Sequence, residues 1–130
     1  MIVLDTCSII WDALSPKNLS RKAKIAINKH EPEGLIFCDI SAWEISMLIK
    51  KGKLQLNETP SNFINTILDS KNYIYKPITP EIADLSVNLG KEINKDPADR
   101  LIVATTITEN LELITADKNL IKSDLVKTIW

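Results

Sequence analysis

Four acidic residues stand where their carboxylates could do chemistry: Asp5, Glu44, Asp99 and Asp117. Each lies beside an apolar run that predicts a buried strand or helix. If the fold brings them together, the four anions repel one another and need a cation, and hard oxygen ligands suit Mg²⁺ or Mn²⁺. Such a site can activate water and stabilise the charge of an in-line attack on a phosphodiester.

The stretch "NKDPADRLIVATT" (94–106) also has a purely structural interpretation. Asp96, Pro97 and Asp99 are suited to the N-cap, the first and the third position of a helix. A carboxylate at a helix N-terminus is stabilised by the helix dipole by ~0.3–1 kcal/mol. Taken alone, either acid is more often a cap than a catalyst.

The other acids have similar structural interpretations. Ser41 and Glu44 have the spacing of a capping box, and Asp5 and Asp117 could each cap a helix that follows them. Capping, however, does not require the four carboxylates to converge. A shared catalytic site does require them to converge. Only the fold can decide between capping and a shared site.

Rival chemistries are poorly supplied with residues. His30 is the single histidine and lies near the end of a charged helix, where a surface position is expected. A Ser-His-Asp or Cys-His site would have to be built around it, and a Cys/His zinc site lacks ligands. Three glycines do not form a phosphate-binding loop. The "DTC" motif has no second Asp two residues after Asp5, as haloacid-dehalogenase-type phosphatases need. Cys7 and Cys38 both lie in apolar stretches and are expected to be buried free thiols.

Strand-like and helix-like runs alternate along the chain, which predicts a parallel sheet covered on both faces. Strands are predicted at 2–4, 34–38, 73–78 and 111–115, with a final edge strand in 125–130, and helices at 20–30, 41–52, 61–70, 80–90 and 97–110 and after Asp117. Ligands of open α/β sheets bind beyond the carboxyl ends of the strands. Asp5 and Asp117 directly follow predicted strands at this edge, and Glu44 lies in the first turn of the helix after the second strand. The distance between Asp99 and this edge depends on the topology of the sheet.

Composition is that of one soluble domain spanning residues 1–130. The first ten residues lack the basic leader of a signal peptide, and no segment has the ~20 apolar residues that cross a bilayer. We therefore expect a cytoplasmic protein. A net charge of −1 argues against avid, non-specific binding to nucleic acid, although lysines and arginine cluster at 21–24 and 50–53.

The whole chain resembles the PIN-domain ribonucleases, and most closely the VapC-type toxins of bacterial and archaeal toxin–antitoxin pairs. The resemblance rests on "IVLDTCSIIW", "SAWEISMLIKKGKL", "DPADRLIVATT" and "LITAD", in family order and at family spacing. It implies a three-layer α/β/α sandwich with a central, mostly parallel sheet, and cleavage of RNA by a divalent metal ion held between acids.

Residue by residue, Asp5, Glu44, Asp99 and Asp117 match the family's acids. Supporting positions are matched by Thr6, Asp96, Arg100 and Thr115, of which Asp96 is better explained as a cap. Arg100 either pairs with a site carboxylate or meets phosphate. Trp43 matches an aromatic position and is interpreted as core packing. Asp39 is either an extra acid near the site or a loop residue.

The leading hypothesis is a Mg²⁺- or Mn²⁺-dependent endoribonuclease that acts as a toxin, forms a homodimer and is neutralised by a small antitoxin. The helix at 61–70 is a candidate dimer face. Asp5, Asp99 and Asp117 would be the main metal ligands, with Glu44 a ligand or a water-positioning group, and cleavage would leave a 5′-phosphate and a 3′-hydroxyl. Two alternatives remain: a PIN-fold RNA-processing nuclease without an antitoxin, and a non-catalytic α/β module that binds a partner.

Overall fold

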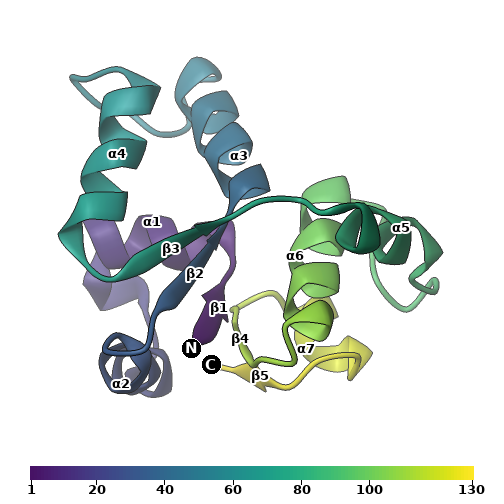
Figure 1. The fold of residues 1–130 in the computed structure, drawn as a ribbon. Helices are drawn as coiled ribbons and strands as arrows, with labels where there is room; N and C mark the ends of the chain where they lie inside the picture. Colours follow the sequence, from purple (N-terminus) through teal and green to yellow (C-terminus); the bar gives the residue numbers. More distant parts are fainter.

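The structure, a computed structural model describing residues 1–130, is built on a five-stranded sheet (Figure 1). The strand order is β3-β2-β1-β4-β5, and all four pairings are parallel. The predicted α/β architecture is confirmed, and the last strand does lie at an edge. The strands are β1 (Ile2–Leu4), β2 (Leu35–Cys38), β3 (Tyr73–Lys76), β4 (Leu113–Ile114) and β5 (Thr128–Ile129).

Seven α-helices connect and flank the strands, and most begin where the sequence predicts. Hydroxyl side chains cap α2, α4 and α5, and proline occupies the first turn of α4, α5 and α6. The helices are α1 (Thr6–Leu14), α2 (Arg21–His30), α3 (Asp39–Lys50), α4 (Pro60–Ser70), α5 (Pro80–Asn88), α6 (Pro97–Thr108) and α7 (Lys118–Ser123), with a 3₁₀ turn at Pro16–Asn18. None of the helices is long and apolar enough to cross a membrane.

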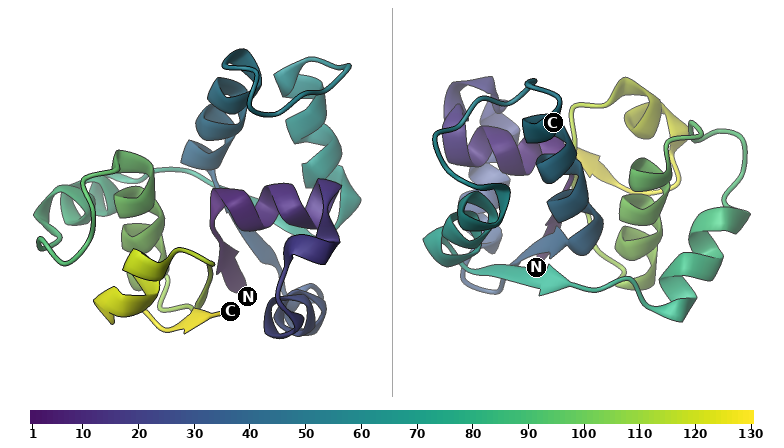
Figure 2. Two further views of the ribbon diagram at one scale, coloured as in Figure 1. Left: turned by 180° about the vertical axis from the view of Figure 1, so that it is seen from behind. Right: turned by 90° about the horizontal axis from the view of Figure 1, so that it is seen from above.

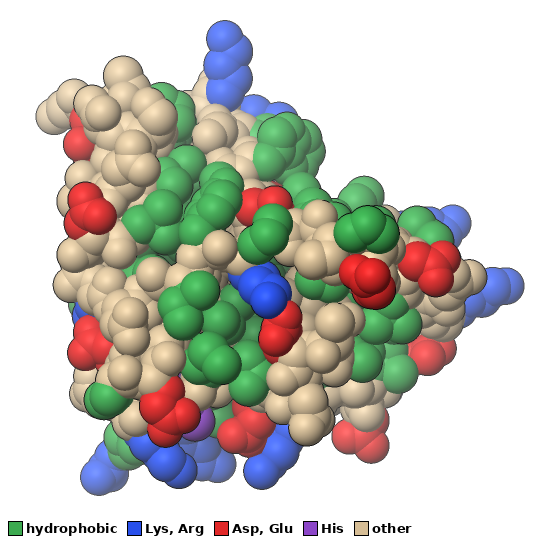
Figure 3. Space-filling view, in the orientation of Figure 1, with side chains coloured by type: hydrophobic (Ala, Val, Ile, Leu, Met, Phe, Trp, Pro, Cys, Tyr) green, Lys and Arg blue, Asp and Glu red, His purple; other side chains and the backbone are tan.

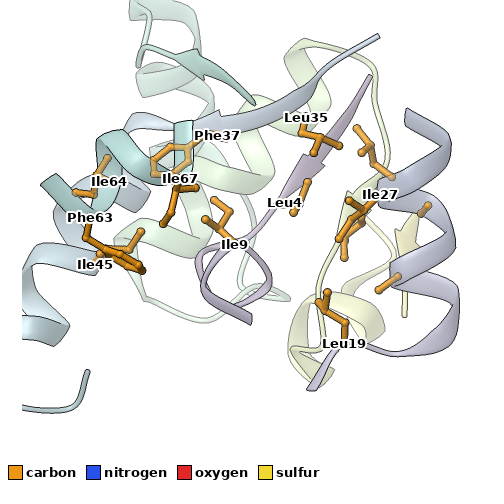
Figure 4. Packing of buried hydrophobic residues seen from close by; sticks show 14 residues of the cluster. Leu4, Ile9, Leu19, Ile27, Leu35, Phe37, Ile45, Phe63, Ile64 and Ile67 are labelled. Carbon is orange, nitrogen blue, oxygen red and sulfur yellow. The ribbon is translucent and has the colours of Figure 1, made fainter. Parts of the chain in front are cut away.

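One face of the sheet packs against α1 to α4. Alternate strand residues point to this face, among them Leu4 on β1 and Phe37 on β2, because successive side chains of a strand alternate between the two faces. Figure 4 shows how residues of the surrounding helices, including Ile9, Ile45 and Ile67, close over them. This cluster of 14 buried residues is the larger core.

The opposite face packs against α6 and α7. Val3 and Ile36 point there and join Ile102 of α6 and Leu120 of α7 in a second cluster of eight buried residues. Helix α5 lies against α6, so it extends this layer away from the sheet (Figures 1 and 2). Two helical layers therefore enclose the sheet, as the predicted three-layer sandwich requires.

The apolar side of α4 is used inside the chain. Phe63, Ile64 and Ile67 are all less than 10% exposed and belong to the larger core. The hypothesis that this helix offers its apolar face to a second copy of the chain is therefore wrong for that face.

Candidate active site

A pocket of about 410 Å³ opens at the carboxyl edge of the sheet and contains all four predicted acids. Asp5 follows β1, and Asp117 follows β4 after two intervening residues. Asp99 reaches the same pocket because α6 leads into the start of β4, which puts the N-terminus of α6 at the strands' carboxyl ends. The lining residues are Asp5, Thr6, Cys7, Trp11, Glu44, Leu48, Asp96, Asp99, Ala116 and Asp117.

Asp5 is both a cap and a wall of the pocket. Its Oδ1 accepts the backbone N–H of Ser8 at 2.9 Å, which caps α1, and its Oδ2 accepts the hydroxyl of Thr115. The residue is only 7% exposed. Burial raises the pKa of Asp5 above its ordinary value, and the nearby charge of Asp117 raises it further, although the bonds from Thr115 and Ser8 oppose both.

Thr115 joins Asp5 to Asp117. Its hydroxyl donates to Asp5 and accepts the backbone N–H of Asp117 at 3.1 Å. Asp117 caps α7, since its Oδ1 accepts the backbone N–H groups of Asn119 at 2.8 Å and Leu120 at 3.1 Å. The second oxygen of Asp117 accepts no hydrogen bond from the protein.

Glu44 is not part of a capping box, so this interpretation of Ser41 and Glu44 is wrong. Helix α3 begins at Asp39, directly after β2, with Cys38 as an N-cap that makes no side-chain bond. Glu44 therefore lies in the second turn of α3, not the first.

The hydroxyl of Ser41 instead supports the site. It lies 2.9 Å from the hydroxyl oxygen of Thr6, and Thr6 donates to Oε1 of Glu44. Because Thr6 has one proton and gives it to the carboxylate, Ser41 must donate to Thr6. Burial raises the pKa of Glu44, and the charges of Asp96 and Asp5 add to this.

Asp96 and Asp99 have different roles at the start of α6. Asp96 is the N-cap, as expected, and its Oδ1 accepts the backbone N–H of Ala98 at 2.9 Å. Asp99 caps nothing, and its Oδ2 accepts the side-chain amide of Asn94 at 3.0 Å. The pKa of Asp99 is raised to about 6, mainly by burial, and the charges of Asp96, Asp117 and Glu44 also raise this pKa.

Arg100 pairs with no carboxylate. Its guanidinium donates to backbone carbonyls of the segment from Ser86 to Asn94: to Ser86 at 3.0 Å, Gly90 at 3.4 Å, Asn94 at 3.3 Å, and Leu89. The side chain therefore fixes the connection between α5 and α6. Asp39 connects the start of α3 to the segment that follows β3, since its Oδ2 accepts the backbone N–H of Ile78 at 3.1 Å.

Two expectations about burial are wrong. The side chain of Trp43 is 59% exposed and does not pack in the core. Cys7 is exposed at the pocket, whereas Cys38 is buried as expected. The pocket wall still removes part of the water around the Cys7 thiol, and this desolvation, together with the charges of four nearby carboxylates, raises the pKa of Cys7 to about 11. The thiol therefore stays protonated at neutral pH and is a poor nucleophile.

The chemistry of this donor set suits a hard divalent cation. No lysine, arginine or histidine lines the pocket to balance its carboxylates. Glu44, Asp99 and Asp117 each use one oxygen in a hydrogen bond to the protein, which leaves the other free. In this structure no three of the acids lie close enough together to hold one ion.

Comparison with known proteins shows the family of the chain. The PIN domain family matches residues 2–124. Ribonuclease VapC22 of Mycobacterium tuberculosis is 32% identical over 119 residues, which cover 92% of this chain and 88% of that protein. The chain belongs to the PIN-domain family.

Solved structures share this PIN fold. A toxin-antitoxin complex from Klebsiella pneumoniae contains a chain with a TM-score of 0.67 and 24% identity, covering 97% of this chain and 95% of that one. VapBC2 from Rickettsia felis, bound to a DNA fragment from its promoter, gives a TM-score of 0.72 at 15% identity, covering 98% of this chain and 97% of that one. At these identities the likeness concerns the fold.

Proposed function

We propose that this PIN-domain protein is a divalent-metal-dependent endoribonuclease and the toxin of a toxin–antitoxin pair. The observation that supports this best is one pocket lined by five carboxylates, of which Glu44 and Asp99 cap no helix. A cluster of uncompensated acids destabilises the metal-free fold, which a purely structural role does not explain. The relative named a ribonuclease supports RNA as the substrate.

Asp5, Asp99 and Asp117 are the proposed ligands of Mg²⁺ or Mn²⁺, and Glu44 is a further ligand or orients the attacking water. When bound, the ion neutralises the carboxylates and polarises water and phosphate for in-line hydrolysis. The chain keeps each carboxylate in place through a neighbouring donor. Thr115 holds Asp5, and the Ser41–Thr6 pair holds Glu44, while an asparagine amide holds Asp99.

The partners follow from the same proposal. The solved relatives include toxin–antitoxin complexes, which supports a small antitoxin that covers the acidic pocket of this chain. We further propose that the 130 residues form one nuclease domain, that the protein is a homodimer, and that it acts on RNA in the cytoplasm.

The test is cleavage of cellular RNA by the purified protein with Mn²⁺ or Mg²⁺ and with EDTA. Wild type should cut RNA only with the metal, and Asp99→Asn should not cut. Asp69→Asn is the matched control, because this exposed acid on α4 forms no hydrogen bond or ion pair. Cleavage that persists in EDTA would contradict the metal mechanism.

Inducible expression of the same variants tests the toxin role. Wild type and Asp69→Asn should stop growth and produce new RNA 5′ ends, whereas Asp99→Asn should do neither. A gene without a small neighbouring reading frame would favour the RNA-processing alternative. Unchanged RNA in Mn²⁺ would favour the non-catalytic binding module.

A further inference from the structure

An exposed apolar surface borders the acidic pocket. We call it the Trp43 face; it is formed by Ile40, Trp43 and Met47 of α3 and by Pro97 of α6. It lines a groove of about 570 Å³ between the two helices, and Glu44 and Asp96 belong to both this groove and the acidic pocket. In Figure 3 hydrophobic side chains follow the flank of α3 that faces the α5–α6 lobe. A group seated on this face is therefore next to the acidic pocket.

Positive charge continues along the same side of α3. Trp43, Met47 and Lys50 are spaced i, i+4 and i+7, so they share one face of the helix. Lys50 lies two turns beyond Trp43, roughly 10 Å along the axis. Lys51 and Lys53 follow, and all three lysines are exposed. A chain leaving the acidic pocket would thus meet first an aromatic ring and then cations.

We propose that the Trp43 face is a subsite on which one unpaired RNA base, next to the scissile phosphate, stacks; this rests on the proposed ribonuclease function. A nucleotide matches each part of the surface in turn. Its ring covers the exposed indole, and its phosphate is attracted to Lys50. An apolar protein side chain would pack against the indole, but it would offer no hydrogen-bond or charged partner to the acids or to the lysines.

Two consequences follow for the bound base. A base in a duplex is already stacked and paired, so the subsite selects single-stranded RNA or loops. The second oxygen of Asp96, a residue that lines the groove, accepts no hydrogen bond, so it is available to an N–H group of the stacked base. All four bases carry such a group on their Watson–Crick edge, as an exocyclic amino group or, in uracil, at ring N3, so this carboxylate can hold the base without selecting among the four.

A double-mutant cycle between protein and RNA tests the proposal. The substrates are a single-stranded ribo-oligonucleotide with the mapped cleavage site and versions with an abasic residue at each flanking position. Trp43→Ala should raise KM roughly five- to a hundred-fold with little change in kcat, as should one abasic position in wild type. Combining the two should add nothing, and Trp43→Phe should restore most of the affinity. Tyr75→Ala is the control, because this aromatic ring is similarly exposed, at 49%, but lines a different groove.

Losses that simply add, or an unchanged KM in Trp43→Ala, would overturn the subsite. If that variant keeps its RNA affinity but no longer binds the antitoxin, the face belongs to a protein partner instead. Fluorescence anisotropy of the labelled oligonucleotide with Asp99→Asn, with and without Trp43→Ala, measures binding without cleavage. If the wild type cuts no RNA, a labelled unstructured ribo-oligonucleotide takes the place of the mapped substrate, and Trp43-dependent binding of it would support the subsite while contradicting the nuclease.

Discussion

Asn94 and Asp99 are joined by a hydrogen bond of 3.0 Å from the amide nitrogen to Oδ2. The side-chain amide oxygen of Asn94 accepts the backbone N–H of Asp96 at 3.0 Å. The backbone N–H of Asn94 donates to the side-chain oxygen of Asn119 at 2.9 Å. Asn119 in turn donates its backbone N–H to Asp117. One asparagine therefore connects the acids at the start of α6 with the acid at the start of α7.

We expect Asn94→Ala to weaken Mn²⁺ binding by roughly 10- to 100-fold, the usual effect of losing a residue that orients a metal ligand. Its amide also lowers the pKa of Asp99, so the pH at which half the metal affinity is lost should move upward. Calorimetric titration with Mn²⁺ between pH 5.5 and 7.5 measures both effects. Asn88→Ala is the control, because that amide bonds only within α5. Equal affinity in the two variants would show that Asn94 does not position Asp99.

The four acids singled out in the sequence do line one pocket, and each lies beside or within an apolar run. The strand and helix pattern alone placed Asp5 and Asp117 at one edge of the sheet. It could not place Asp99, whose position depends on the direction of α6 relative to β4. Asn94 had no visible signal, since its role exists only because α7 packs beside the α5–α6 connection.

The errors around α3 have one physical cause. Strand β2 passes into α3 without a loop, so the N-cap is Cys38, three residues earlier than the Ser41 signal suggests. That shift moves Ser41 into the buried interior, where it reaches Thr6. Because Trp43 is apolar, its residue type alone does not show whether it is buried in the core or exposed to solvent. Ile45 fills the core position on α3, which leaves Trp43 on the open side.

Stability without metal should rise as the pH falls from 7.5 to 5.5. The pKa of Asp99 is about 6 in the folded protein, above its ordinary value of 3.8, so the folded state binds the proton more tightly than the unfolded chain. The penalty for ionising it is complete above pH 6 and is relieved as the pH falls toward 4. Burial shifts the pKa values of Asp5 and Glu44 in the same direction.

Thermal melting in EDTA at the two pH values measures this effect. Asp99→Asn should reduce the gain, since it removes one of the groups that take up a proton. Added Mn²⁺ should stabilise wild type more at pH 7.5 than at 5.5, because protons compete with the metal for the same oxygens. A gain in EDTA that is as large in Asp99→Asn as in wild type would contradict the role given to this carboxyl group.

Arg100→Lys should lower the free energy of unfolding by about 1–2 kcal/mol, although it conserves the charge. A lysine ammonium lacks the planar fork with which the guanidinium reaches several carbonyls between Ser86 and Asn94. Amide hydrogen exchange should accelerate in residues 89–96, and urea unfolding gives the stability. Arg21→Lys, the same change at an exposed site on α2, should have little effect. Equal stabilities would mean that the carbonyl contacts contribute nothing.

Asp96 and Asp99 allow a direct separation of capping from metal binding. Asp96→Ala removes the N-cap of α6 and should lower stability in EDTA by about 1 kcal/mol, whereas Asp96→Asn keeps a capping oxygen and should lose less. Asp99→Asn removes a charge that its neighbours repel, so stability in EDTA should be unchanged or higher.

Metal should reverse this order. Mn²⁺ should raise the Tm of wild type and Asp96→Asn but should stabilise Asp99→Asn little, and only that variant should lose RNA cleavage completely. An Asp99→Asn protein that melts lower in EDTA, responds fully to Mn²⁺ and still cuts RNA would show that Asp99 serves only to start the helix.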